Sequence, residues 1–150
     1  MGISYKRLGS ADVALLHELL EVFAVAFNEP GEYRGAVPTE AYLRALLGKP
    51  HVVVLTAQAE GKVVGGIVAY VLEKFERARS EVYLYDLAVA EPFRRRGIAR
   101  QLIQTLKRTA KELGAYVLFV QADPPDEPAI RLYESLGTRE DVHHFDIAVE

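Results

Sequence analysis

The 150-residue chain contains no cysteine and no tryptophan. The absence of cysteine excludes disulfide bonds, thiol nucleophiles and cysteine-ligated zinc, and the four histidines lack the spacing of a metal site. We therefore expect no metal. No apolar run approaches the ~18 residues that a membrane span needs, and the first ten residues contain no signal-peptide core. The sequence predicts a soluble, cytoplasmic protein.

The length and composition are those of one globular domain. Half of the residues are hydrophobic and 26% are charged, and no repeat, linker or low-complexity segment interrupts the chain. A chain of this length buries roughly 68–70% of its unfolded surface, so it can form a core without a disulfide or a structural metal. We expect a single domain over residues 1–150.

The net charge of −3 conceals two oppositely charged segments. Residues 91–112 carry seven basic side chains against two acidic ones, a local charge of +5 that would attract an anion. Residues 121–150 carry eight acidic side chains against two basic ones, a local charge of −6 that would attract a cation. From charge alone, the simpler explanation that both segments are solvated surface is preferred, because surface charge mostly serves solubility.

Hydrophobic periodicity divides the chain into helices and strands. Strands are predicted over 3–8, 51–58, 62–72, 81–89, 115–121 and 143–149, and helices over 11–27, 39–47, 97–113 and 128–136. The turn formers between 28 and 38 predict a loop. The order predicts an α/β fold in which helices flank a mixed sheet.

Some local details are specific enough to test. Ser10 is expected to cap the helix over 11–27, whose buried stripe includes Leu20. Asp126 is expected to cap the helix over 128–136. The nearly all-apolar strand over 115–121 is expected to be buried on both faces.

A basic turn joins the strand that ends at Val89 to the helix that begins near Gly97. Free backbone N–H groups at a helix start, next to small residues, make a binding site for a pyrophosphate. The turn has neither the G-x-x-x-x-G-K-S/T nor the G-x-G-x-x-G pattern, so kinase and dinucleotide functions lose support. A nucleic-acid surface would need a wider basic stripe with interleaved aromatic residues, so we expect no nucleic-acid partner.

Two motifs resemble those of the GCN5-related N-acetyltransferases, the GNAT superfamily. Residues 94–99, RRRGIA, match the R/Q-x-x-G-x-G/A loop, and residues 129–137, AIRLYESLG, look like the A-x-x-L-Y-x-x-x-G helix that carries the family's tyrosine. Segments 70–89, 113–123 and 143–147 look closest to aminoglycoside acetyltransferases that modify the 3-amino group. The chain departs from the family pattern at Thr138, where phenylalanine is usual, at Asp126, where asparagine is common, and in its short tail.

The resemblance implies a GNAT acyltransferase fold with a mostly antiparallel sheet, in which strands 81–89 and 115–121 splay apart. It also implies direct transfer of an acetyl group from acetyl-coenzyme A to an amine, without an acyl-enzyme. The implied coenzyme-binding residues are Leu87, Ala88, Val89, Arg94, Arg95, Arg96, Gly97, Ile98, Ala99 and Asp126. The implied catalytic residues are Tyr133 as the acid and Asp86 or Asp123 as the base, and the implied acceptor-binding residues are Tyr85, Glu127, His144 and Asp146.

Several of these roles have simpler alternatives. Tyr133 is also explained as a packing residue, Asp126 as a helix cap, and the base as a water molecule. The expected acceptor is a polycationic small-molecule amine, with an aminoglycoside preferred. A polyamine or protein amine as the acceptor, and a coenzyme-binding module without catalysis, remain open alternatives. A homodimer is also open, because dimers are frequent in the family.

Overall fold

The protein is described by a computed structural model, which covers residues 2–28 and 35–150. Residues 29–34 of the loop expected over 28–38 lie outside the described residues. No helix within the described ranges has the length and apolar character needed to cross a membrane.

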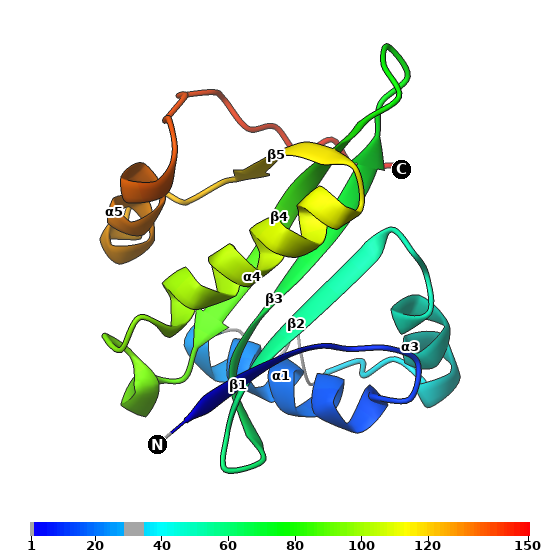
Figure 1. The fold of residues 1–150 in the computed structure, drawn as a ribbon, viewed down its shortest axis with the longest axis vertical. Coiled ribbons are helices and arrows are strands. Elements are labelled where there is room, and N and C mark those ends of the chain that lie inside the picture. The colour runs from blue at the N-terminus through cyan, green and yellow to red at the C-terminus, as the bar shows by residue number, and fades with distance from the viewer. Residues whose placement is uncertain (1, 29–34) are drawn as a thin grey trace.

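The observed elements confirm an α/β fold with a mixed sheet (Figure 1). In chain order they are β1 (Ile3–Arg7), α1 (Val13–Ala26), α3 (Glu40–Leu47), β2 (Val52–Ala59), β3 (Lys62–Glu73), β4 (Ser80–Val89), the 3-10 helix η1 (Glu91–Phe93), α4 (Ile98–Glu112), β5 (Ala115–Val120) and α5 (Glu127–Leu136). The strands lie in the order β1-β2-β3-β4-β5. Neighbours are antiparallel from β1 to β4, whereas β5 runs parallel to β4.

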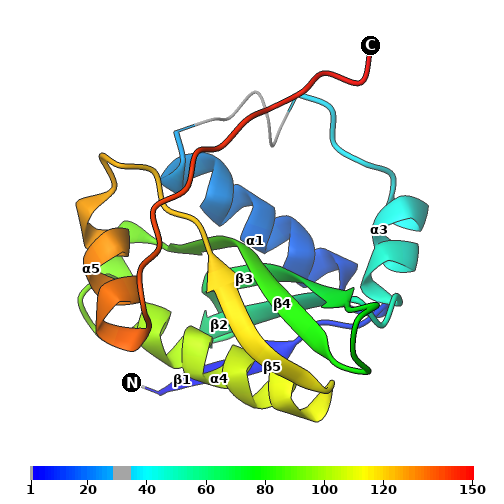
Figure 2. The same ribbon diagram turned by 90° about the horizontal axis from the view of Figure 1, so that it is seen from above.

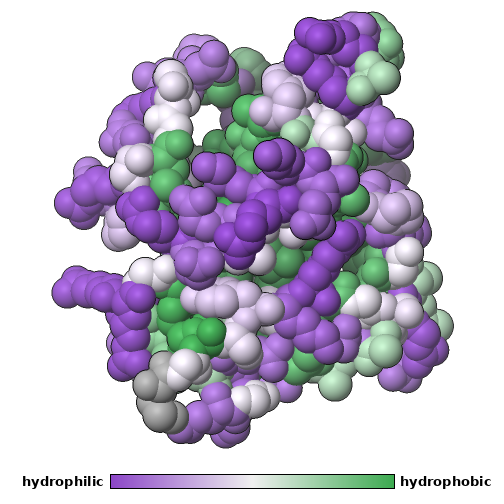
Figure 3. Space-filling model, in the orientation of Figure 1, coloured by the Kyte–Doolittle hydropathy of each residue, from purple (hydrophilic) through white to green (hydrophobic). Residues whose placement is uncertain are grey.

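The sheet separates two hydrophobic cores, because alternate side chains of each strand point to opposite faces. On one face, Leu102 and Leu106 of α4 are fully buried against residues such as Val53. On the other face, Leu19 and Phe23 of α1 are fully buried. Figure 2 shows α1 and α4 on opposite sides of the sheet, with α5 beside α4. The outer surface of α4 is hydrophilic in Figure 3, as expected for an amphipathic helix.

Helix α1 begins later than expected, and its cap is Asp12 rather than Ser10. The Asp12 carboxylate accepts a hydrogen bond from Gly9 N at 2.7 Å and contacts Lys6 Nζ at 2.9 Å. The bond from Gly9, followed by the bond from Lys6, lowers the pKa of Asp12. The Asp12 side chain thus bonds to the turn before the helix, and it makes no capping hydrogen bond to the first turn of α1.

Strand β5 is less buried than its apolar sequence predicts. Tyr116 and Val117 are 51% and 40% exposed. Within the described sheet β5 is an edge strand. The expected burial on both faces is therefore wrong: the strand has a sheet neighbour on one side, and α4 contacts it from one face.

The strand expected over 143–149 does not form, and residues 137–150 are exposed throughout. An extended segment becomes a strand only when a neighbouring strand takes up its backbone hydrogen bonds. Figure 2 shows the C-terminal segment rising away from the sheet on the α1 side. The segment therefore pairs with no strand of the described sheet.

Gly66 sets how closely α1 approaches the sheet. A Cβ atom at Gly66 would lie 2.5 Å from the carbonyl oxygen of Leu55 and 2.6 Å from Leu19 Cδ1. We expect Gly66→Ala to lower the free energy of unfolding by about 1–3 kcal/mol through overpacking. Urea denaturation measures the change. Gly9→Ala is the matched control, because its Cβ would meet no atom closer than Asp12 Oδ2 at 3.9 Å, and an equal loss in the two variants would contradict the explanation.

Candidate active site

Strands β4 and β5 pair over only the first half of β4, and then they separate. The register joins Ser80–Leu84 to Ala115–Val120. From Asp86 to Val89, β4 pairs with β3 alone within the described sheet. The divergence expected between these two strands is therefore present. It leaves one edge of β4 available to another hydrogen-bonding partner.

A β-bulge at Tyr85 coincides with this separation. Leu84 and Asp86 lie opposite consecutive residues of β3, so Tyr85 is the extra residue of β4. A bulge reverses which alternate positions face a given side of the sheet. Leu84 before the bulge and Leu87 after it both pack on the α4 side. Ala88 packs in the core on the α1 side of the sheet. Asp86 is two residues before Ala88 in the same strand, so it faces the same side.

Four aromatic rings line this part of the sheet, and we call them the aromatic row: Tyr70, Tyr85, Tyr83 and Phe119. The Tyr85 ring meets Tyr70 and Tyr83 edge-on, with centroids 5.6 Å apart in both pairs. Tyr83 stacks on Phe119 at 4.6 Å. The Tyr83 hydroxyl donates to Gln121 Oε1 at 2.9 Å. The row thus crosses β3, β4 and β5, and it includes Tyr70 and Phe119, which local sequence patterns did not single out.

Asp86 lies close to this row. Burial, followed by the neighbouring Tyr85 and Asp86, raises the pKa of both Tyr70 and Tyr83. Asp86 is itself half-buried, whereas Tyr85 is 57% exposed. The bulge therefore combines a carboxylate with an accessible aromatic ring at the point where β4 leaves β5.

The basic turn has the backbone of an anion site. Arg95 and Gly97 have φ angles of +63° and +78°. Left-handed residues alternating with ordinary ones point successive N–H groups into one concavity, which suits an anion. Gly97 also begins α4 as its N-cap, so the positive end of a 15-residue helix faces the same place. A Cβ atom at Gly97 would meet nothing within 4 Å, so the space in front of the turn is open.

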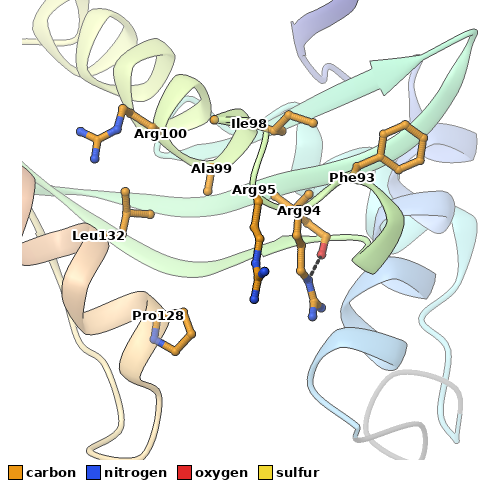
Figure 4. Close-up of a pocket in the computed structure, with 10 residues that line it drawn as sticks. Phe93, Arg94, Arg95, Ile98, Ala99, Arg100, Pro128 and Leu132 are labelled. Atoms are coloured by element: carbon orange, nitrogen blue, oxygen red, sulfur yellow. Dashed lines mark hydrogen bonds between the residues drawn. The ribbon is translucent and has the colours of Figure 1, made fainter.

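A pocket of about 280 Å³ lies between this turn and α5 (Figure 4). It is lined by Val89, Phe93, Arg94, Arg95, Gly97, Ile98, Ala99, Arg100, Pro128 and Leu132. Arg100 Nη2 donates to Ser135 Oγ at 2.9 Å and so ties the two walls together. Most of the coenzyme-binding residues expected in the turn therefore line one cavity.

The three consecutive arginines occupy different positions. Arg95 extends into the pocket, as Figure 4 shows. Arg94 Nε donates to the carbonyl oxygen of Val89 at 2.8 Å, so this side chain braces the turn and already bonds one backbone group expected to bind coenzyme. The Arg96 guanidinium lies 5.3 Å from the centre of the Phe93 ring in a cation–π contact. Arg96 is not among the lining residues.

Helix α5 carries Tyr133, which is half-buried against the α4-side core. Burial, followed by the charge of Asp126, raises the pKa of Tyr133 to about 12. Asp126 caps the helix as expected, with Oδ1 accepting from Ala129 N at 3.3 Å. Leu132, the neighbour of Tyr133, lines the pocket.

The acidic segment does not converge on one point. Asp123 follows β5 in an exposed stretch, and Glu127 is exposed at the start of α5. His144 Nε2 lies 2.9 Å from Asp146 Oδ1, and both side chains are exposed in the C-terminal segment. Of the expected acceptor-binding residues, only Tyr85 lies beside the base candidate Asp86, whereas His144 and Asp146 bond to each other in the exposed C-terminal segment. Within residues 2–28 and 35–150, no three His, Asp or Glu side chains are grouped closely enough to hold a metal ion.

Comparison with known proteins agrees with this architecture. A model of the acetyltransferase (GNAT) family matches residues 14–138, and the chain belongs to this family. The fold and the site define an acetyl-coenzyme A-dependent N-acetyltransferase. The open space before the turn, the left-handed residues Arg95 and Gly97, and the start of α4 suit the pyrophosphate of that cosubstrate.

Three relatives cover nearly the whole chain. A crystal structure of the aminoglycoside acetyltransferase HMB0005, from an uncultured soil metagenomic sample, is 50% identical with a TM-score of 0.98, and covers 100% of both chains. The aminoglycoside acetyltransferase meta-AAC0020, from a similar source and solved with sisomicin, is 31% identical with a TM-score of 0.91, over 99% of this chain and 97% of that one. An uncharacterized N-acetyltransferase of Bacillus subtilis, YhfO, is 26% identical over 93% of this chain and 91% of its own.

Gly97 provides a direct test of the anion site. We expect Gly97→Val to abolish acetyl-coenzyme A binding, measured by calorimetry, because the branched side chain would enter the open space before the turn. The positive φ also adds strain of roughly 1–2 kcal/mol. Gly114→Val is the matched control, since Gly114 has a φ of +82°, an equally open Cβ direction and a position at the far end of α4. Unchanged affinity for acetyl-coenzyme A in a folded Gly97→Val variant would show that the turn does not bind the pyrophosphate.

Proposed function

We propose that the protein acetylates the 3-amino group of an aminoglycoside with acetyl-coenzyme A. The observation that carries the proposal is the half-buried Asp86 beside the aromatic row, at the point where β4 leaves β5. The full-length similarity to an aminoglycoside acetyltransferase at 50% identity supports the same acceptor class.

An aminoglycoside combines two chemical features that suit this face. Its sugar rings present C–H surfaces that can pack on aromatic faces, and its ammonium groups are attracted to carboxylates and to aromatic rings. Tyr85 offers an exposed ring, and Asp86 offers a carboxylate next to it. Glu127, His144 and Asp146 are exposed residues that would contact the periphery of the acceptor.

The coenzyme would lie where β4 and β5 separate, on the side away from the acceptor. Its pyrophosphate would bind the N–H groups between Arg95 and Ala99, and its pantetheine arm would pair with the free edge of β4 at Leu87 and Ala88. The thioester would then lie beside Asp86. A backbone N–H near Ala88 would stabilise the negative charge that develops on the carbonyl oxygen.

The reaction needs three proton movements. The attacking amine must be neutral, so Asp86, directly or through a water molecule, would accept its proton. Asp123 is the weaker candidate, because it lies in an exposed stretch beyond β5. The amine nitrogen then forms a bond to the carbonyl carbon, the carbon–sulfur bond breaks, and the Tyr133 hydroxyl donates a proton to the leaving thiolate. The nitrogen releases its second proton through water, which restores the Tyr133 hydroxyl.

Tyr133→Phe tests the acid role. We expect kcat to fall by about 10²–10⁴-fold, with little change in acetyl-coenzyme A affinity, because only the hydroxyl is lost. Since the pKa of Tyr133 is raised to about 12, the wild-type phenol stays protonated, and its ionisation should cost no activity as the pH rises to about 10. Steady-state kinetics across this pH range provide the measurement. An unchanged kcat, with chemistry shown to limit turnover, would leave Tyr133 as a packing residue.

Asp86→Asn tests the base. We expect a kcat loss of about 10²–10⁴-fold that higher pH does not fully restore, because the isosteric amide cannot accept the proton. Asp123→Asn is the matched control. It should act mainly on the KM of a polycationic acceptor, and this effect should shrink as salt is added. If the two variants exchange these phenotypes, Asp123 is the base.

The acceptor itself can be identified by following free thiol release. Purified protein and acetyl-coenzyme A are mixed with aminoglycosides, polyamines, an amino-terminal peptide and uncharged sugars. We expect thiol release with aminoglycosides. NMR of the product should show that the acetyl group is on the 3-amino group. Preference for the peptide or a polyamine would overturn the acceptor, and release with none would overturn the enzyme proposal. Aminoglycoside resistance and a cytoplasmic site of action, where acetyl-coenzyme A is supplied, belong to the same proposal.

A further inference from the structure

Helix α5 is weakly anchored for an element that carries an active-site tyrosine. None of its ten residues is fully buried, whereas α4 has Leu102 and Leu106 fully buried in the core. Helix α5 contacts the α4-side core through the partly buried Leu132, Tyr133 and Leu136. Apolar burial is non-directional, so it holds the helix on the core without fixing its rotation about its own axis. The placement of the Tyr133 hydroxyl therefore needs a directional contact.

A chain of two hydrogen bonds between α4 and α5 supplies such a contact. Arg100 Nη2, in the first turn of α4, donates to Ser135 Oγ at 2.9 Å. The Ser135 hydroxyl in turn donates to the carbonyl oxygen of Leu132 at 2.6 Å. A side chain of α4 is thus joined to the backbone of α5 one residue before Tyr133. Because hydrogen bonds are directional, this link restrains the rotation that burial leaves open.

The stability of the helix itself does not explain a serine at position 135. Serine has a lower helix propensity than alanine, and a hydroxyl that bonds back to a carbonyl of the preceding turn slightly destabilises a helix. The favourable contact that distinguishes Ser135 from an alanine is therefore the bond from Arg100.

Arg100 occupies an unusual position in α4. The first turn of this helix contains Arg100 and no acidic residue, although the positive end of a helix disfavours a cation. Arg100 also lines the pocket of about 280 Å³ between the two helices, and Figure 4 shows it with Pro128 and Leu132 of α5. A guanidinium has five N–H donors, so Arg100 can donate to an anion in this pocket and to Ser135 at the same time.

We propose that Arg100 and Ser135 are positioning residues that couple coenzyme binding to the orientation of α5 and so hold the Tyr133 hydroxyl toward the leaving thiolate. Both side chains of the link are exposed, so water competes with their hydrogen bond when no coenzyme is bound. Once the phosphate charge fixes Arg100, the bond to Ser135 costs less entropy and restrains α5 more strongly. The part concerning Tyr133 rests on the proposed function, whereas the coupling between coenzyme and α5 does not.

Amide hydrogen exchange tests the coupling without catalysis, with coenzyme A as the probe. In the wild type, coenzyme A should slow exchange in α5, including residues 133–136, which lie beyond the pocket-lining Pro128 and Leu132. In Ser135→Ala the protection of 133–136 should be lost, while calorimetry shows little change in the affinity for coenzyme A. No protection in the wild type, or equal protection in the two proteins, would overturn the proposal.

Steady-state kinetics test the position of the Tyr133 hydroxyl. We expect Ser135→Ala to lower kcat by about 10–10²-fold, because a small misplacement of a reacting group is costly. The KM for acetyl-coenzyme A should change little, since Arg100 keeps its charge in the pocket. Ser135→Thr should restore most of kcat, because threonine retains the hydroxyl. A wild-type kcat in Ser135→Ala would overturn the proposal.

Glu134→Ala is the matched control for Ser135→Ala. Glu134 is the neighbouring residue of α5, and its carboxylate contacts Arg139 of the C-terminal segment at 3.2 Å, so the variant removes a polar contact that does not reach α4. Its kcat should remain that of the wild type. An equal loss of kcat in the two variants would show that α5 responds to any lost contact, and the proposal would be wrong.

A double variant shows whether Ser135 acts through Tyr133. In a chain that carries Tyr133→Phe, adding Ser135→Ala should lower kcat by no more than about twofold, because the hydroxyl to be positioned is absent. Losses that multiply in full would overturn the positioning role. If Tyr133→Phe alone retains full kcat, the proposed acid role is wrong, and hydrogen exchange still decides whether Arg100 and Ser135 couple the coenzyme to α5.

Discussion

The separation of β4 from β5 is the constraint on which the site depends. Parallel pairing ends at Leu84 and Val120, so the rest of β4 is held from the β3 side only. A backbone edge is thereby exposed inside a sheet, where hydrogen-bonding groups are otherwise paired. The bulge at Tyr85 falls at the same point and turns Asp86 to the α1 face. One irregularity thus provides both an edge for an extended ligand arm and a carboxylate for the second substrate.

The basic turn depends on the same strand for its position. It begins where β4 ends, and Arg94 ties it back to Val89. Helix α4 fixes the other end, because Leu102 and Leu106 are fully buried in the core beneath it. The N–H groups of the turn are thus oriented before any ligand arrives, and binding an anion requires little reorganisation. Arg94, which bonds to Val89, and Arg96, which lies over the Phe93 ring, stabilise the turn, whereas Arg95 extends into the pocket.

The sequence predicted most reliably what is local to one segment. The strand, basic turn and helix around Gly97 are continuous in the chain, so their geometry could be predicted from residue types alone. The aromatic row could not, because Tyr70 and Phe119 come from separate strands and the bulge reverses the alternation between Tyr83 and Asp86. The start of α1 was missed as well, because Ser10 and Asp12 have similar preferences for the N-cap position and the Asp12 carboxylate bonds to Gly9 N and Lys6 instead of capping the helix.

The alternation over 143–149 predicts a strand with one apolar face, yet the chain does not form that strand. An alternation of apolar and polar residues indicates that one face of the segment will be buried. It does not indicate which edge of the sheet the segment would pair with. That choice depends on the departure from α5 and on which sheet edge is open. Because Lys6 and Arg7 protect the β1 edge and β5 carries no charge, the sheet itself discriminates between its two ends. Whether the C-terminal segment becomes a strand is therefore decided by the edges of the assembled sheet, and the sequence of the segment alone does not contain this information.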